Sequence, residues 1–107
     1  MCERNYCEGG IQVIFQGSHH LVSELHGHYE IQPIYVNNRP YFKMKKQGIW
    51  WSSGFWFIGP HKAKGQTKGY AYHVTEDYCP HQLKNKNWTV STNQGLIYEQ
   101  KLSITCK

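Results

Sequence analysis

Short runs of apolar and aromatic residues, often alternating with polar ones, recur along the whole chain of 107 residues. A period of two is typical of β-strands, whereas the helical period of 3.6 is nearly absent, with His19–Leu25 as the one modest candidate. The pattern predicts short strands at Ile11–Phe15, His28–Ile31, Pro40–Met44, Ile49–Trp51, Phe55–Ile58, Gly69–Val74, Trp88–Val90, Leu96–Glu99 and Leu102–Thr105.

Turn residues separate these runs and indicate how the strands connect. Asn37 and Asn38 both tolerate a positive φ, and Ser52-Ser53-Gly54 lies between two aromatic runs, as in a β-hairpin. Pro33 is expected to interrupt the second strand, because proline cannot donate a backbone hydrogen bond. These signals predict an all-β fold: a small single domain over residues 1–107 with an antiparallel sheet, arranged as a meander, a partly closed barrel or a sandwich.

Four cysteines, Cys2, Cys7, Cys79 and Cys106, lie toward the two ends of the chain. In a short chain this number is typical of two disulfides in a secreted protein, and the sequence leaves all three pairings open. A CxxC spacing that would favour a metal site is absent. We therefore expect a disulfide-stabilised, secreted domain, and no apolar run is long enough to predict a transmembrane segment.

A series of short motifs runs through most of the chain. In order, they are Gly27-x-Tyr29-Glu30-Ile31, Val36-Asn37-x-Arg39-Pro40-x-Phe42, Phe55-Trp56-x-Ile58-Gly59-Pro60, Gly69-Tyr70-Ala71-Tyr72, Cys79-Pro80, Trp88-x-Val90 and Leu102-x-Ile104. Their order over about residues 21–106 resembles a β-rich module found singly or in tandem in large invertebrate and protist proteins, often beside extracellular domains. The resemblance implies an extracellular binding or adhesion role.

The distribution of charge is uneven. Between Glu30 and Glu76 there is no acidic residue, while seven basic residues give this stretch a formal charge of +7. The seven are Arg39, Lys43, Lys45, Lys46, Lys62, Lys64 and Lys68. The same stretch holds ten of the sixteen aromatic residues. A region of one sign attracts polyanions, although a solvated lysine face that only keeps the protein soluble is the alternative.

Carbohydrate binding, with a possible preference for anionic glycans, is the function that this combination favours. Aromatic rings can stack on the apolar face of a sugar, and lysines can contact hydroxyl or sulfate groups. The candidate ligand-binding residues are Trp50, Trp51, Trp56, Tyr70, Tyr72, Lys43, Lys45 and Lys46. Adjacent strand residues point to opposite faces, so one of Trp50 and Trp51 is expected to be exposed. Burial of both faces of this hairpin is the alternative.

Catalytic and nucleic-acid motifs are missing. Glu76 and Asp77 would point to opposite faces of a strand, and the sequence has no nucleophile elbow, phosphate-binding glycine loop or zinc-protease motif. We therefore expect no enzyme activity and no cofactor. Arg39 is the only arginine of the basic stretch, and the lysines suit heparin-like glycans better than specific nucleic acid.

Three other functions remain open at this stage. The domain could be a structural or adhesion module that binds a protein or a second copy of itself, or a cationic host-defence protein. His26 and His28 share a face of a strand and could hold a divalent ion, but a polar, partly exposed loop is the favoured interpretation, so no metal is expected.

Overall fold

The computed structural model describes residues 9–15, 25–74, 86–92 and 95–106. In chain order the elements are β1 (Ile11–Phe15), β2 (Gly27–Val36), β3 (Arg39–Met44), β4 (Gln47–Ser52), β5 (Phe55–Pro60), the 3-10 turn η1 (His61–Ala63), β6 (Ala71–Val74), β7 (Lys86–Thr92) and β8 (Gly95–Cys106). The described residues contain no α-helix, so the prediction of an all-β, antiparallel fold is confirmed.

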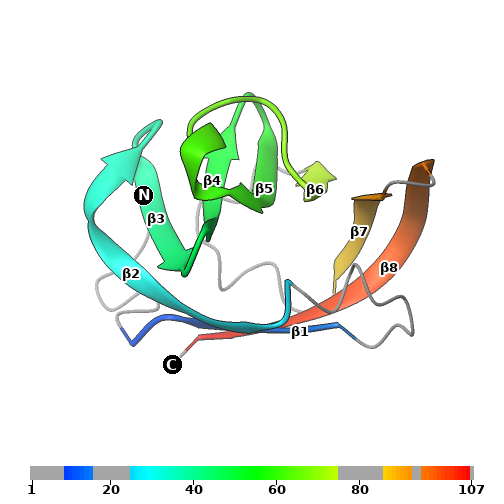
Figure 1. Ribbon diagram of the computed structural model, residues 1–107, viewed down its shortest axis with the longest axis horizontal. Coiled ribbons are helices and arrows are strands. Elements are labelled where there is room, and N and C mark those ends of the chain that lie inside the picture. The colour runs from blue at the N-terminus through cyan, green and yellow to red at the C-terminus, as the bar shows by residue number, and fades with distance from the viewer. Residues whose placement is uncertain (1–8, 16–24, 75–85, 93–94, 107) are drawn as a thin grey trace.

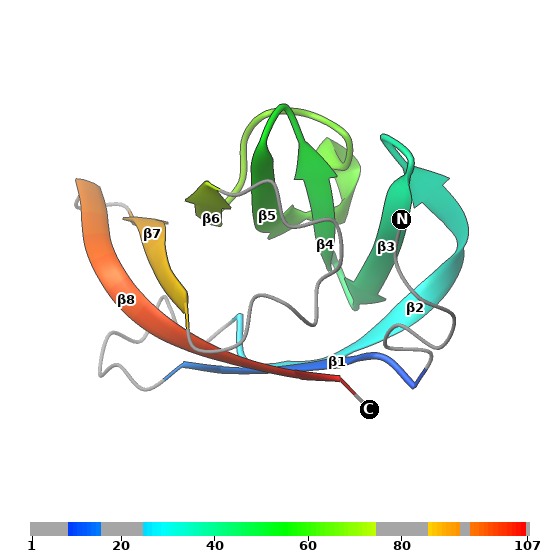
Figure 2. The same ribbon diagram turned by 180° about the vertical axis from the view of Figure 1, so that it is seen from behind.

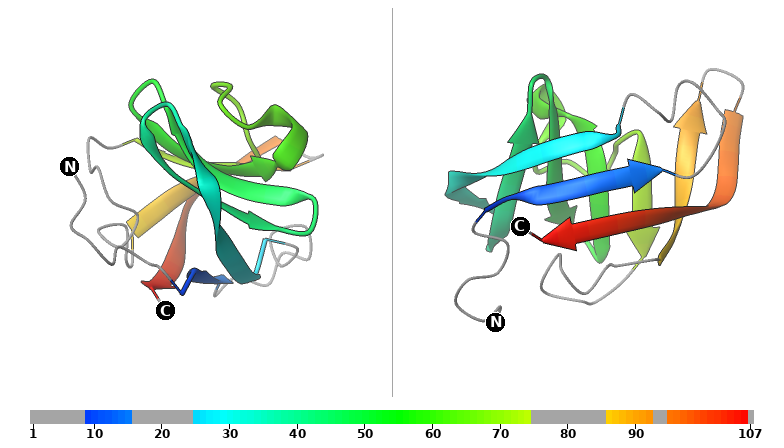
Figure 3. Two further views of the ribbon diagram at one scale, coloured as in Figure 1. Left: turned by 90° about the vertical axis from the view of Figure 1, so that its left-hand side faces the viewer. Right: turned by 90° about the horizontal axis from the view of Figure 1, so that it is seen from below.

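The strands form one sheet that curls into a barrel (Figures 1 and 2). Each strand pairs antiparallel with the next one along the chain, which is a meander, and β8 returns to pair with β1. This last pairing runs from Ile11 opposite Cys106 to Phe15 opposite Leu102 and closes the ring. Figure 3 shows β1 lying between β2 and β8. Of the predicted arrangements, the meander and the barrel are observed together in the described residues, and the sandwich is not.

Most strand bounds differ slightly from the prediction, and the largest differences are in β2 and β8. Pro33 does not end β2, because the register between β2 and β3 shifts between Ile31 and Tyr35, and this irregularity accommodates a residue without an N–H. The two runs predicted at 96–99 and 102–105 belong to one long strand, β8, which pairs with β7 along its first half and with β1 along its second.

The interior of the barrel is filled by apolar and aromatic side chains from every strand. This inner core consists of Ile11, Val13, Leu25, Tyr29, Phe42, Ile49, Trp56, Ile58, Ala71, Trp88, Val90 and Ile104. An eight-stranded barrel is just wide enough for side chains to fill it, and here large rings do so. Trp56 and Trp88 belong to this core and have no exposed surface.

A second apolar cluster lies on the outer face of β3, β4 and β5. It consists of Val36, Tyr41, Trp50, Phe57 and Ala63, with Phe55 and Tyr72 packed against it. Residues 61–70, which we call the covering loop, include η1 and contribute the buried Ala63 to this outer cluster (Figure 1). Both faces of β4 and β5 are therefore apolar, and each face has its own covering layer.

Two glycines allow this outer layer to pack closely. A Cβ on Gly48 would overlap the ring and hydroxyl of Tyr41. A Cβ on Gly59 would lie 2.9 Å from the Cα of Gly69 and 3.0 Å from the Trp50 ring. The absence of a side chain at residue 59 therefore lets the covering loop return against β5, where the Tyr70 N–H donates to the Ile58 carbonyl at 2.8 Å.

Candidate anion-binding hollow

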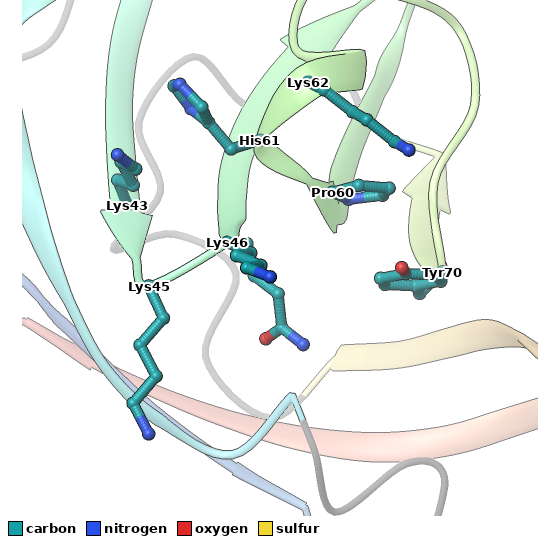
Figure 4. A pocket seen from close by; sticks show the side chains of 8 residues that line it. Lys43, Lys45, Lys46, Pro60, His61, Lys62 and Tyr70 are labelled. Atoms are coloured by element: carbon teal, nitrogen blue, oxygen red, sulfur yellow. The ribbon is translucent and has the colours of Figure 1, made fainter.

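Four lysines line a hollow at the end of the barrel where β3 turns into β4 (Figure 4). Its volume is about 630 Å³, and its walls come from Lys43, Lys45, Lys46, Gln47, Pro60, His61, Lys62 and Tyr70. The described residues that line it include no aspartate or glutamate. Four ammonium groups around one concavity favour an anion, because each attracts negative charge and repels its neighbours when the hollow is empty.

The two sides of the hollow differ in chemistry. Figure 4 shows the rings of Pro60 and Tyr70 on one side, while Lys43 and His61 lie on the other. Tyr70 keeps 42% of its surface exposed, so its ring is accessible to a ligand. The hollow therefore combines an accessible ring surface with a cationic wall, which suits a ligand that has an apolar face and an anionic substituent.

The covering loop, which supplies three of the lining residues, is anchored to the outer face of the sheet. The indole N–H of Trp50 donates to the Gln66 carbonyl at 2.9 Å, and Ser52 Oγ lies 2.9 Å from Thr67 Oγ1. Asn37 Nδ2 donates to the Gly65 carbonyl at 3.3 Å. These contacts fix the middle of the covering loop against the sheet. They therefore hold the lining residues of the loop beside those of β3 and β4, which are distant in sequence.

His61 is held by a buried tyrosine. Its Nδ1 lies 2.6 Å from the hydroxyl of Tyr41, and its backbone N–H donates to the Lys46 carbonyl at 2.6 Å. Burial raises the pKa of Tyr41 to about 12, so the phenol keeps its proton at neutral pH. Desolvation, together with the charges of Lys43 and Lys64, lowers the pKa of His61, and the imidazole is therefore neutral at pH 7.

Gln47 is positioned by the inner core. The hydroxyl of Tyr29 lies 3.0 Å from Gln47 Oε1 and 2.8 Å from the Leu25 carbonyl oxygen. Burial raises the pKa of Tyr29 well above its ordinary value, so this hydroxyl remains a donor. The contact with Tyr29 therefore holds the side chain of Gln47 in place at the hollow.

The structure brings together half of the candidate ligand residues named from the sequence. Lys43, Lys45, Lys46 and Tyr70 all line the hollow. Tyr72, by contrast, is half-buried and packs edge-on against Phe55 on the outer face, and it does not line the hollow.

The three tryptophans of the candidate set pack in the two apolar layers. Trp50 belongs to the outer cluster and Trp56 to the inner core, and neither has any exposed surface. Trp51 points away from Trp50, as predicted, but it is half-buried against the inner core, and the guanidinium of Arg39 lies 3.9 Å from its ring centre. The alternative in which both faces of the hairpin are covered is therefore the one observed.

Four lining residues were not among the candidates, namely Gln47, Pro60, His61 and Lys62. Lys62 belongs to the second lysine group of the basic stretch, so its charge was visible in the sequence. Gly59-Pro60 indicated only the end of a strand. What the sequence does not show is that η1 turns back over the sheet and places His61 beside Lys43.

Other predicted features are not found at this site. His26 and His28 are exposed at the start of β2, and the described residues contain no group of three or more His, Cys, Asp or Glu side chains that could hold a metal. Cys2, Cys7 and Cys79 lie outside the described residues, and Cys106 ends β8, so disulfide formation stays a prediction. No helix in the described part of the chain is long and apolar enough to cross a membrane.

Comparison with known proteins does not assign the chain to a family. No protein-family model, curated protein or solved structure matches the chain.

Proposed function

We propose that this domain is a non-enzymatic, extracellular binding module that recognises anionic glycans in the basic hollow. The observation that carries the proposal is that Lys43, Lys45, Lys46 and Lys62 all line a concavity that also presents the Tyr70 ring. A sulfated or carboxylated sugar matches both features of the hollow. Its anionic substituents suit the lysines, and the apolar C–H face of its ring suits the Tyr70 ring. The cysteine count and the motif order support an extracellular setting.

The direct test compares one glycan with and without its charges. A heparin-derived hexasaccharide and its desulfated form are titrated into the protein, and the dissociation constants are measured at low salt and at about 1 M salt. We expect the sulfated form to bind, and part of that binding to survive high salt, because the ring contact with Tyr70 is not screened. If all binding is lost at high salt, the lysines act as a general cationic surface that attracts any polyanion. If the hexasaccharide does not bind at all, the proposal is rejected.

A second candidate function is a protein-interaction module, and one surface feature favours it. Ile34 and Tyr35 of β2 are 44% and 60% exposed, and Pro33 beside them is exposed as well. All three lie on one exposed segment of β2, and exposed apolar surface can mark a protein contact.

Sedimentation velocity over a wide concentration range tests the self-association form of this candidate. If β2 mediates self-association, the sedimentation coefficient rises with concentration, and Tyr35→Ser abolishes the rise. A coefficient that does not change with concentration argues against a homo-oligomer.

A further inference from the structure

We propose that His61, a lining residue of the hollow, makes the binding of an anionic glycan proton-linked. The inference rests on the proposed function. In the free protein the imidazole is a neutral donor held by Tyr41, and it takes up one proton when an anionic group of the ligand enters beside it. The domain therefore binds such ligands more tightly in mildly acidic solution.

The contact with Tyr41 determines which nitrogen meets the ligand. Since Nδ1 lies 2.6 Å from the Tyr41 hydroxyl, Nε2 is the nitrogen left for a ligand or for water. In the tautomer in which Tyr41 donates to Nδ1, the ring proton is on Nε2, which then donates to an acceptor oxygen. When the ring is doubly protonated, Nδ1 donates and the hydroxyl oxygen accepts, because a phenol can fill either role.

The charges around His61 keep it neutral while the hollow is empty. Lys43 of β3 and Lys64 of the covering loop oppose its protonation, in addition to desolvation, which lowers its pKa most. Lys45, Lys46 and Lys62 line the same hollow. Tyr41 also faces His61, and burial keeps its phenol protonated at neutral pH, while Tyr70 lines the same hollow. Glu30 of β2 is opposite Lys43 in the register between β2 and β3.

An anion in the hollow reverses this balance. Its negative charge compensates the lysines and favours the imidazolium, so binding raises the pKa of His61. By thermodynamic reciprocity, protonation of His61 tightens binding by the same factor. Each unit by which the ligand raises the pKa of His61 corresponds to a tenfold difference in affinity between the protein with His61 protonated and the protein with His61 neutral.

The test follows the ring itself in the intact chain. Histidine ring resonances are recorded by NMR between about pH 5 and pH 8, with and without a saturating heparin-derived hexasaccharide. We expect the His61 midpoint to lie below the ordinary value of about 6.5 in the free protein and to rise by roughly one unit with the ligand. In calorimetry at about pH 6.5, the reaction heat should depend on the buffer, which reports proton uptake.

Variants separate His61 from the other histidines. The affinity ratio between about pH 5.5 and pH 7.5 should be roughly 3- to 10-fold in the wild type and should fall toward one in His61→Gln. His28→Gln removes an exposed imidazole that does not line the hollow, and it should leave the ratio unchanged. Tyr41→Phe should move the His61 midpoint, because Nδ1 loses its partner.

Three outcomes would overturn the inference. A His61 midpoint that the ligand does not move, or a pH ratio that persists in His61→Gln, would reject the role of His61 while leaving glycan binding intact. If the hexasaccharide binds at neither pH, the proposed function itself fails, and this inference fails with it. The NMR titration uses the wild-type chain, so a variant that does not fold cannot obscure the result.

Discussion

Replacing Trp50 with alanine should lower the free energy of unfolding by about 3–5 kcal/mol, the usual cost of removing a large buried ring. Trp50 has no exposed surface, stacks on Phe57 at 6.0 Å between ring centres, and donates to the Gln66 carbonyl. Its removal leaves a cavity in the outer cluster and an acceptor in the covering loop without its donor. For a domain of this size, the melting temperature should fall by roughly 4 °C or more for each kcal/mol.

Denaturation in urea or by heat measures this effect, and two related variants separate its parts. Trp50→Phe keeps most of the ring but removes the N–H, so it should cost about 1 kcal/mol for the hydrogen bond plus the loss from a smaller side chain. Trp51→Ala removes a half-buried ring and should cost less than Trp50→Ala. A Trp50→Ala protein as stable as the wild type would show that this ring is not part of a packed layer.

The architecture was largely accessible from the sequence because strand signals are local. The apolar and aromatic runs at 11–15 and 40–44 can be recognised from neighbouring residues alone, and both segments lie in strands. The opposite directions of Trp50 and Trp51 follow from the pleat of any strand. Closure of the ring was not accessible in the same way, because it depends on the pairing of β1 with β8 across most of the chain.

The environment of the tryptophans could not be predicted, for a related reason. A strand that is apolar on both faces can present one of them to a ligand or bury both, and the residues of the strand do not distinguish these cases. Whether the outer face is exposed or buried depends on the covering loop, which has a polar composition and no periodicity of its own. It packs over Trp50 only because Gly59 and Gly69 permit a close approach of two backbones.

The candidate site shows the same division between local and distant information. Lys43, Lys45 and Lys46 were identified because they are close together in the sequence, and they do line one hollow. His61 and Lys62 reach the same hollow through the path of β5 and η1, which no spacing along the chain encodes. Charge could therefore be predicted as a property of the region, whereas its arrangement around a cavity required the fold.

Removing two charges from the hollow should have the largest effect on ligand binding. In Lys46→Gln/Lys62→Gln, both changes replace an exposed lysine that lines the hollow, and neither removes a buried group. Two unit charges about 4 Å apart interact by about 1 kcal/mol even in water, so two lost contacts should weaken hexasaccharide binding by roughly 30-fold at low salt. The affinities are compared in a His61→Gln background, so that a change in the protonation of His61 does not contribute to the difference.

The matched control is Lys64→Gln/Lys68→Gln, which removes the same net charge from exposed positions of the covering loop that do not line the hollow. Because the charge of Lys64 also acts on His61, the binding of this control is compared with that of the hollow variant in a His61→Gln background. If the ligand occupies the hollow, this control should weaken binding only a few-fold, and the difference between the two variants should shrink at about 1 M salt, where exposed charges are screened within about 3 Å. Equal losses in both variants would mean that the ligand responds to net charge alone, and the hollow would then have no special part in binding. The thermal unfolding of both variants should match the wild type, because exposed lysines contribute little to stability.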